Sequence, residues 1–407
     1  MQRDGKRSQH SGRRMFGAPP QPDMCHSRAD RRTRPAAACG GWRSLLLAAI
    51  LSIPACTTAP ERRNGSMAPA RPLVIAHRGA SALLPEHTLA AYAKAIDDGA
   101  DFIEPDLVMT RDGVLVARHD NVLDDTTDVA LHARFADRRG TRTIDGETLT
   151  GWFVEDFSLA ELSTLRARER LPQLRSTASD GLHAIPTFDA IVALVEQASR
   201  GRDRPIGLIP ELKHSSHHHA QGLDPEQALV EAIGRHAYLR HAPLGVQSFE
   251  IGNLQRLRTM LAAHDHVFLV QLVGAPDEVP VDRRLAGDMT RTYASMLTAA
   301  GLAAIASHAD VLAPPARMVV PLDARGALAA PSGLVEAAHA AGLEVHAWTL
   351  RPENAFLPPA LRCAGGDAVR CEAGAIAEAR ALAAAGVDAV FADDPGLALR
   401  AFRDGRD

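Results

Sequence analysis

The sequence of 407 residues has little of three features that mark common classes of protein. Clustered cations are confined to the N-terminus: residues 1–55 hold 10 Lys/Arg against 3 Asp/Glu, while the whole chain has a net charge of −4. The remaining chain is therefore acidic, which argues against nucleic acid as a partner. Cysteine is scarce, and no further Cys or His lies at zinc spacing around Cys363 and Cys371. The apolar run Leu45–Ala55 is too short to remain as a membrane-spanning helix.

The N-terminal region reads as a targeting segment. Four arginines between positions 31 and 43 precede the apolar run, as in a signal peptide, so residues 1–55 are predicted to be removed. Residues 53–56, Ile-Pro-Ala-Cys, resemble a bacterial lipobox, which implies lipidation of Cys56 and attachment to a membrane in the periplasm through that lipid alone. Plain secretion after cleavage near Ala55 is the alternative. Residues 56–70 are rich in Thr, Ala, Pro and Arg and are predicted to be a tether.

Only two cysteines, Cys363 and Cys371, lie in the main body of the chain. They are close in sequence, and the targeting segment places them in an oxidising compartment. We therefore predict a disulfide between them rather than a metal site.

Short apolar runs alternate with helical segments from Leu73 onward, which predicts a parallel α/β fold over residues 71–407. The predicted strands are Leu73–Ala76, Phe102–Asp106, Ile206–Glu211, Leu244–Ser248, Val267–Leu272, Asp310–Ala313, Glu344–Thr349 and Ala389–Ala392. The predicted helices are Leu89–Asp98, Phe188–Arg200, Pro225–His236, Ile251–His264, Leu302–His308, Ser332–Ala341 and Ala375–Ala385. Eight such β/α units favour a closed TIM (β/α)8 barrel over an open sheet.

One segment breaks this alternation. Asp112-Gly113 predicts a hairpin that leads into the run Val114–Ala117. Residues 121–185 then follow, polar and weakly periodic, and they are long for a loop. They predict a small functional insertion after the second β/α unit. Because the segment follows His119 at the end of an apolar run, we expect it over the C-terminal mouth of the barrel.

Charged side chains gather at the ends of the predicted strands, where an α/β barrel carries its active site. The first strand ends on His77 and Arg78, and the second on Glu104 and Asp106. His119 follows the run Val114–Ala117, and Glu211 and Lys213 lie at the end of the third predicted strand. Residues two apart on a strand share a face, so Glu104 and Asp106 point the same way.

These residue types predict a metal-assisted reaction on an anionic substrate. Glu104, Asp106 and Glu211 form an all-oxygen ligand set, which favours Ca²⁺, or else Mg²⁺, over Zn²⁺. Two cationic side chains, Arg78 and Lys213, are predicted to bind phosphate. The imidazoles of His77 and His119 are the candidate acid and base. Taken singly each residue has a structural alternative, such as a hydrogen-bonding histidine or a solvated strand edge.

Other features carry weaker signals. Trp348 would contact the substrate or fill the barrel, and Gln247 is a candidate polar contact at the mouth. His214 and His217–His219 form a His-rich loop that would bind a transition metal or, more simply, remain polar surface. Asp393-Asp394-Pro395 is interpreted as a cap for a turn and the following helix.

The strand-end residues resemble the glycerophosphodiester phosphodiesterase family, and most closely its periplasmic bacterial branch. The matching stretches are His77-Arg78-Gly79-Ala80, Leu84–Thr88, Glu104–Thr110, His119-Asp120, Pro210–Lys213, Val270–Val273 and Val390–Asp393. The resemblance covers roughly residues 73–400. Two residues depart from the family pattern: His87 stands where the family usually has Asn and is given no role, and Pro105 separates the two carboxylates where a polar residue is usual.

The resemblance implies a TIM barrel that hydrolyses glycerophosphodiesters to sn-glycerol 3-phosphate and an alcohol. It implies Ca²⁺ on the three carboxylates, His77 and His119 as acid and base, and Arg78 on the phosphate. A barrel phosphodiesterase acting on lysolipid or sphingolipid is one rival reading, although the polar insertion speaks against it. A surface lipoprotein that binds without turnover is the other. The expected partners are small glycerophosphodiesters, and nothing in the sequence sets the oligomeric state.

Overall fold

The computed structural model describes residues 71–403 of the chain. The predicted targeting segment, the lipidation site Cys56 and the tether lie outside these residues. Among the helices within residues 71–403, none is long and apolar enough to cross a membrane.

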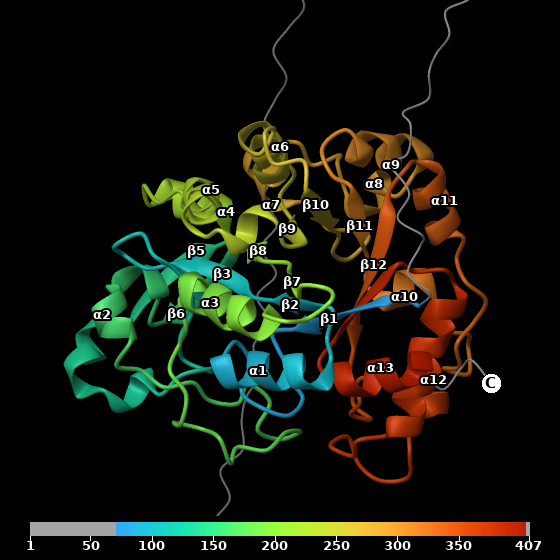
Figure 1. Cartoon of the computed structure of the whole chain (residues 1–407), viewed down its shortest axis with the longest axis horizontal. Coiled ribbons are helices and arrows are strands. Elements are labelled where there is room, and N and C mark those ends of the chain that lie inside the picture. The colour runs from blue at the N-terminus through green and yellow to red at the C-terminus, as the bar shows by residue number, and fades with distance from the viewer. Residues whose placement is uncertain (1–70, 404–407) are drawn as a thin grey trace, which may run out of the picture. The chain divides into compact units, whose positions relative to one another are not determined.

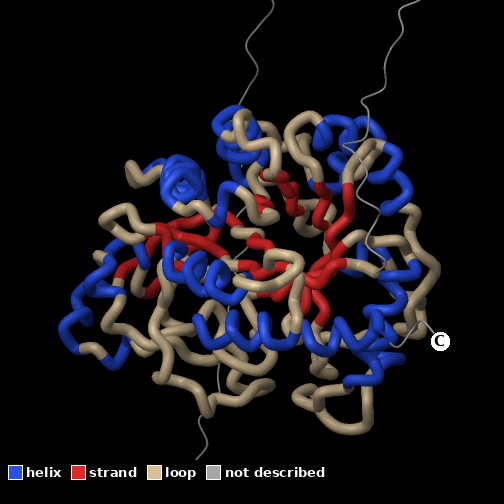
Figure 2. Tube along the Cα trace, viewed as in Figure 1, coloured by secondary structure: helices blue, strands red, loops and turns tan. Residues whose placement is uncertain are grey.

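The central element is a closed barrel of parallel strands surrounded by helices (Figure 1, Figure 2). Its strands are β1 (Leu73–His77), β2 (Phe102–Glu104) continued by β3 (Asp106–Met109), β7 (Gly207–Leu208) continued by β8 (Glu211–Leu212), β9 (Leu244–Ser248), β10 (Val267–Leu272), β11 (Val311–Ala313), β12 (Glu344–Leu350) and β13 (Ala389–Ala392). The first strand, β1, pairs with the last strand, β13, and β9 pairs with β10, so the ring of strands is closed. Within residues 71–403 the predicted eight-strand barrel is therefore confirmed.

Proline interrupts two of the barrel strands near the predicted site. Pro105 separates β2 from β3, and Pro210 precedes β8, because proline has no N–H to donate to a ladder. The alignment is kept, since the carbonyl of Pro105 accepts a hydrogen bond from the Glu211 N–H at 2.9 Å. The parallel register consequently pairs Asp106 with Glu211, and in the neighbouring ladder His77 with Glu104. Strand pairing alone thus brings the predicted ligands together.

Helices follow the strands as expected. The longer ones are α1 (Leu89–Asp98), α3 (Phe188–Ser199), α5 (Pro225–Arg235), α6 (Ile251–Met260), α9 (Ala299–Ala306), α11 (Leu334–Ala340), α12 (Glu372–Ala384) and α13 (Pro395–Arg403). Shorter ones are α4 (Ser215–Ala220), α7 (Val281–Leu285), α8 (Tyr293–Met296), α10 (Ala316–Val319) and the 3-10 turns η4 (Tyr238–Arg240) and η5 (Pro359–Leu361). In α1 the hydroxyl of Thr88 accepts from Ala91 N–H, and Gly99 ends the helix at φ 96°. Their apolar faces pack on the barrel and form the main core.

The segment at 121–185 carries its own secondary structure and core. It contains η1 (Val129–Leu131), η2 (Ala133–Arg138), the hairpin β5 (Gly140–Ile144) and β6 (Glu147–Gly151), η3 (Val154–Asp156) and α2 (Leu159–Leu162). It follows β4 (Leu115–Ala117), which pairs antiparallel with β3 through the predicted hairpin, and precedes α3. The segment therefore lies inside the second β/α unit, between its strand and its helix, and the predicted position after that unit was wrong. A separate cluster centred on Phe135, Trp152 and Phe157 holds it together, which its polar composition did not indicate.

Cys363 and Cys371 form a disulfide between β12 and α12, with their Cα atoms 5.3 Å apart. The bond closes a loop of the described chain that lies after β12. Cys371 itself is buried against Leu357 and Leu397, so the crosslink is anchored in a small apolar cluster.

Candidate active site

Three carboxylates converge at the C-terminal ends of neighbouring barrel strands. Glu104, Asp106 and Glu211 each present an oxygen, and these oxygens lie within 4.8 Å of one another. All three side chains are buried. The structure thus brings together residues that are more than 100 positions apart, as predicted from the strand ends.

Their electrostatics reflect this crowding. Burial and the Asp106 carboxylate raise the pKa of Glu104. Burial, with Asp106 as a neighbour, also raises the pKa of Glu211 to about 8. Burial acts in the same direction on Asp106, but the Lys213 ammonium and the hydrogen bond with His87 lower its pKa well below the usual range. Like-charged carboxylates this close repel one another unless a cation lies between them.

The donor set fits a divalent metal ion. It consists of oxygens alone, which suit hard cations such as Ca²⁺ and Mg²⁺. Gln247 lies beside it, and its amide Nε2 donates to Glu104 Oε1 at 2.9 Å. This contact fixes one carboxylate, as outer hydrogen bonds do around metal ligands. Gln247 is itself almost fully buried, so its predicted contact with substrate remains a prediction.

His77 ends β1 and pairs with an aspartate from the opposite end of the chain. Its Nδ1 lies 2.6 Å from Asp393 Oδ1, and Asp393 follows β13, the strand next to β1. Burial and the nearby Arg78 lower the pKa of His77, which favours the neutral imidazole. The interpretation of Asp393 as a cap was wrong: Asp394 caps α13 through Leu397 N–H, and Asp393 orients a histidine.

His119 follows β4 and has an equivalent partner. Its Nδ1 lies 2.6 Å from Oδ1 of the adjacent Asp120. Burial, together with Arg78 and Lys213, lowers the pKa of His119 to about 3. Both predicted acid/base residues therefore have the Nδ1 side of the ring occupied by a carboxylate, which leaves Nε2 for a reacting group.

Cationic side chains border the carboxylates. The Arg78 guanidinium has Nε 3.3 Å from Asp106 Oδ2 and Nη1 3.1 Å from Glu86 Oε2, and the Arg78 backbone N–H donates to Glu104 at 2.7 Å. Lys213 Nζ lies 3.1 Å from Glu211. The turn that carries Arg78 requires Gly79 at φ 86°, because a Cβ there would meet the Ala91 backbone at 2.8 Å. Both predicted phosphate-binding side chains thus border the carboxylate cluster.

His87, to which no role was assigned above, lies against a predicted metal ligand. Its Nε2 is 2.9 Å from Asp106 Oδ2 and its Nδ1 is 2.8 Å from the Tyr92 hydroxyl. The side chain is fully buried. His87 therefore orients Asp106, and its place in the Pro85–Thr88 motif was the signal that could have indicated this.

Trp348 lies in β12, where its indole N–H donates to the Ala313 carbonyl at 2.9 Å. Its ring meets Phe249 edge to face, with centroids 6.1 Å apart, and Lys213 Nζ lies 5.8 Å from the Phe249 centroid. Trp348 is partly exposed. Phe249 therefore lies between Lys213 and Trp348. Contact of Trp348 with the substrate remains a prediction.

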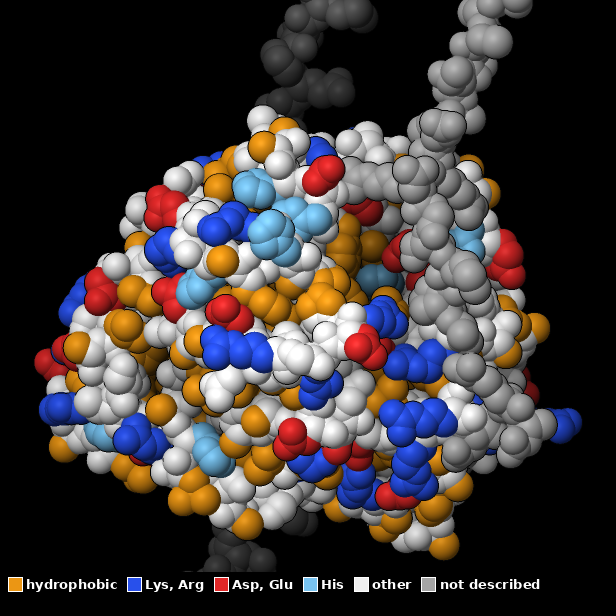
Figure 3. Space-filling view, in the orientation of Figure 1, with side chains coloured by type: hydrophobic (Ala, Val, Ile, Leu, Met, Phe, Trp, Pro, Cys, Tyr) orange, Lys and Arg blue, Asp and Glu red, His pale blue; other side chains and the backbone are white. Residues whose placement is uncertain are grey.

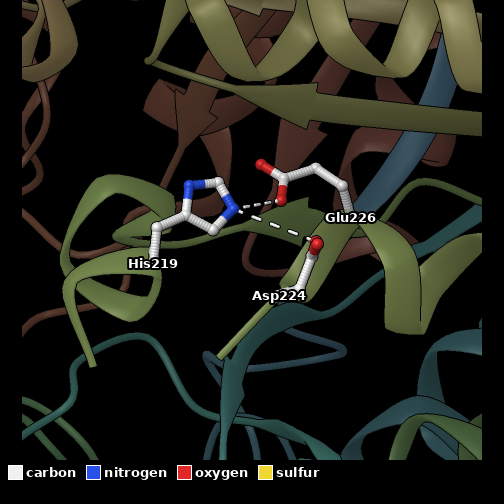
Figure 4. Close-up of side chains that lie close together, drawn as sticks. All are labelled: His219, Asp224 and Glu226. Carbon is white, nitrogen blue, oxygen red and sulfur yellow. Dashed lines mark hydrogen bonds and ion pairs between the residues drawn. The ribbon is translucent and has the colours of Figure 1, made fainter. Parts of the chain in front are cut away.

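The His-rich stretch is helix α4 rather than a loop, and histidine side chains gather on the surface around α4 and α5 (Figure 3). Figure 4 shows His219 with Asp224 and Glu226, a group with metal-ligand geometry. Arg256, however, lies 2.5 Å from Asp224 and 2.9 Å from Glu226. The guanidinium already balances these carboxylates, so the group is an ion-pair network.

Comparison with known proteins indicates the family of the chain. Residues 77–397 match the model of the glycerophosphoryl diester phosphodiesterase family. Glycerophosphodiester phosphodiesterase GDPD6 of Arabidopsis thaliana is 36% identical over 330 residues, which cover 77% of this chain and 84% of the relative. The glycerophosphodiester phosphodiesterase of Haemophilus influenzae is 29% identical over 252 residues, covering 58% and 65%.

Solved structures show the same fold. A crystal structure of a protein from Silicibacter pomeroyi assigned to this family superposes with a TM-score of 0.55 at 24% identity, covering 83% of this chain and 94% of that one. A phosphodiesterase of Oleispira antarctica, solved with sn-glycerol-3-phosphate, gives 0.50 at 22% identity, with coverage of 81% and 96%. The family match over most of the chain and the Arabidopsis relative together show that the chain belongs to the glycerophosphoryl diester phosphodiesterase family.

Proposed function

We propose that this protein hydrolyses glycerophosphodiesters to sn-glycerol 3-phosphate and an alcohol, with a divalent cation, best Ca²⁺, held by Glu104, Asp106 and Glu211. The observation that carries the proposal is the convergence of these three buried carboxylates beside two histidines that are each oriented by an aspartate. The names of the Arabidopsis and Haemophilus relatives support the substrate class.

The residues divide the reaction as follows. A bound cation would polarise a phosphate oxygen and balance the charge that develops on it. Arg78 and Lys213 add positive charge on the same side, and their donors suit phosphate oxygens. One imidazole takes a proton from the attacking oxygen, which belongs either to water or to the substrate's own glycerol hydroxyl; in the second case water then opens the cyclic phosphate. The other imidazole, in its protonated form, gives a proton to the departing alcohol oxygen. His77 and His119 fill these roles through Nε2, since Nδ1 of each is engaged by Asp393 or Asp120.

The test is release of sn-glycerol 3-phosphate from glycerophosphocholine by purified protein with Ca²⁺, without added ion, and with a chelator. We expect turnover with Ca²⁺, loss with the chelator, and no turnover by the Glu211→Gln variant. Lysophosphatidylcholine and sphingomyelin are run in parallel. Absence of product from glycerophosphocholine, or preference for either lipid, would contradict the proposal.

We further propose that the protein acts in the periplasm, anchored through a lipid on Cys56, which lies outside the described residues. The lipobox-like residues 53–56 support this. Labelling of cells with a radioactive fatty acid should mark the wild-type protein and leave Cys56→Ser unlabelled. Labelling of both proteins, or of neither, would contradict lipidation at Cys56.

A further inference from the structure

The loop at residues 168–176 of the insertion, called here the arginine loop, reaches the same two aspartates that contact His77 and His119. Arg175 Nη2 lies 2.5 Å from Asp393 Oδ2, and its Nε lies 2.9 Å from Glu353. Its Nη1 also donates to the Ser81 carbonyl at 2.9 Å. The Arg175 side chain is only 7% exposed, so these contacts are shielded from solvent.

Arg170, five residues earlier, makes the matching contacts on the other side. Its Nη1 lies 2.6 Å from Asp120 Oδ2. Its Nε and Nη2 lie 2.9 and 2.7 Å from the two oxygens of Glu86. Glu86 in turn holds Arg78 at 3.1 Å. Arg170 therefore links Asp120, which contacts His119, with Glu86, which contacts Arg78.

The two aspartates use their oxygens in the same way. In Asp393, Oδ1 meets His77, and Oδ2 meets Arg175 and also Arg351 Nε, at 3.1 Å. In Asp120, Oδ1 meets His119 and Oδ2 meets Arg170. A carboxylate held at both oxygens cannot rotate freely, and a guanidinium holds its partners in a fixed planar geometry. A carboxylate fixed at Nδ1 sets the tautomer and direction of an imidazole.

We propose that the arginine loop is a positioning element of the active site, in which Arg175 and Arg170 orient His77 and His119 through Asp393 and Asp120. The proposal rests on the proposed function, because it assigns these histidines to the reaction. The insertion would support the two histidines through these two arginines alone, and no residue of the loop is expected to touch the substrate.

The kinetic test compares Arg175→Gln and Arg170→Gln with Arg168→Gln. Arg168 belongs to the same loop but is 49% exposed and pairs only loosely with Asp180, at 3.6 Å. On glycerophosphocholine with saturating Ca²⁺, we expect kcat to fall about 10- to 100-fold in the first two variants, with a smaller change in KM, and to stay unchanged in the control. Arg175→Lys and Arg170→Lys should recover only part of the loss, because an ammonium cannot hold two carboxylates as a guanidinium does.

A second substrate separates positioning from general damage. In the nitrophenyl diester of glycerol 3-phosphate the leaving group needs little proton donation. The variant that misplaces the acid should therefore approach wild-type kcat on this diester, whereas the variant that misplaces the base should not. Equal losses in both variants on both substrates, accompanied by lower melting temperatures, would overturn the proposal. So would an unchanged kcat.

Nitrogen-15 NMR of the histidines provides a test that does not depend on turnover. The wild type should show hydrogen-bonded Nδ1–H signals for His77 and His119. Arg175→Gln should shift the first signal and Arg170→Gln the second. Unchanged signals in well-folded variants would overturn the positioning role even if the enzyme is active. Absence of turnover by the wild type would contradict only the proposed function.

Discussion

The barrel and the insertion contribute to one site by different means. The barrel supplies Glu104, Asp106 and Glu211 from paired strands, so the ladder itself sets their separation. The insertion supplies Arg170 and Arg175 from a loop without regular structure, and ion pairs set their place. Positions fixed by strand register follow from local sequence, whereas positions fixed by long-range ion pairs do not. The difference also predicts which changes abolish chemistry and which loosen it.

The largest effect is expected at His77 and His119, because both regions contribute residues that position these histidines. His77→Ala and His119→Ala should each lower kcat about 100- to 10 000-fold, because each removes a proton-transfer group. The circular dichroism spectrum and the melting temperature should stay close to those of wild type, since both rings lie at the edge of the core. The measurement is turnover of glycerophosphocholine with Ca²⁺. An unchanged kcat in either variant would remove that histidine from the mechanism.

A core change in the insertion should be the next largest. Phe157 is fully buried and its ring meets Phe135 with centroids 4.9 Å apart. Phe157→Ala should lower the free energy of unfolding by about 3–5 kcal/mol. If the insertion is a separate cooperative unit, limited proteolysis of the variant will cut within 121–185 before the barrel opens, and activity will fall. Leu131→Ala is the control, because Leu131 is 78% exposed. Simultaneous cleavage of the insertion and the barrel would show that the two regions do not unfold separately.

Acid should weaken the attachment of the insertion. Glu155 accepts hydrogen bonds from Arg142, Asn121 and, on α4, His217. Burial raises the pKa of Glu155, but the hydrogen bonds from His217, from its own backbone N–H and from Asn121 outweigh it and lower the pKa to about 2. Because the folded-state pKa lies below the ordinary value of 4.5, the stabilisation is present above pH 4.5 and is lost as pH falls toward 2.

The difference between these pKa values corresponds to about 3 kcal/mol. Melting temperatures measured from pH 7 to pH 2 should therefore fall more steeply for wild type than for Glu155→Gln. Glu147→Gln, at an exposed position of β6, should follow the wild-type curve. Parallel curves for wild type and Glu155→Gln would exclude this contact as the source of acid sensitivity.

The smallest effect is expected at an exposed arginine pair on the outside of the barrel. Arg235 on α5 lies 3.1 Å from Asp189 on α3, and the two side chains are 54% and 49% exposed. Arg235→Ala should change the free energy of unfolding by less than about 1 kcal/mol and leave kcat unaltered. Urea unfolding measures it. A loss as large as that in Phe157→Ala would show that exposure does not separate the two kinds of contact.

Much of the fold and part of the site followed from local patterns. All eight predicted strands are present, with Asp310–Ala313 shortened to Val311–Ala313. Pro105, which departs from the family pattern, divides the predicted strand Phe102–Asp106 into β2 and β3. The core of the insertion was not predicted, because Phe135, Trp152 and Phe157 stand among polar residues without periodicity. Ca²⁺ as the bound ion, the phosphate contacts and the lipid on Cys56 stay predictions.

Local sequence patterns were sufficient to predict the barrel and the carboxylate cluster. Alternating side chains, strand ends and the rhythm of the β/α units are local properties, and closure of the ring makes those ends meet. The partners of the two candidate catalytic histidines, in contrast, could be identified only from the folded chain. Asp393 is 316 positions from His77 and 218 from Arg175. Ion pairs across such separations leave no period or spacing in the chain, so they become visible only once the barrel closes and the insertion folds over its mouth.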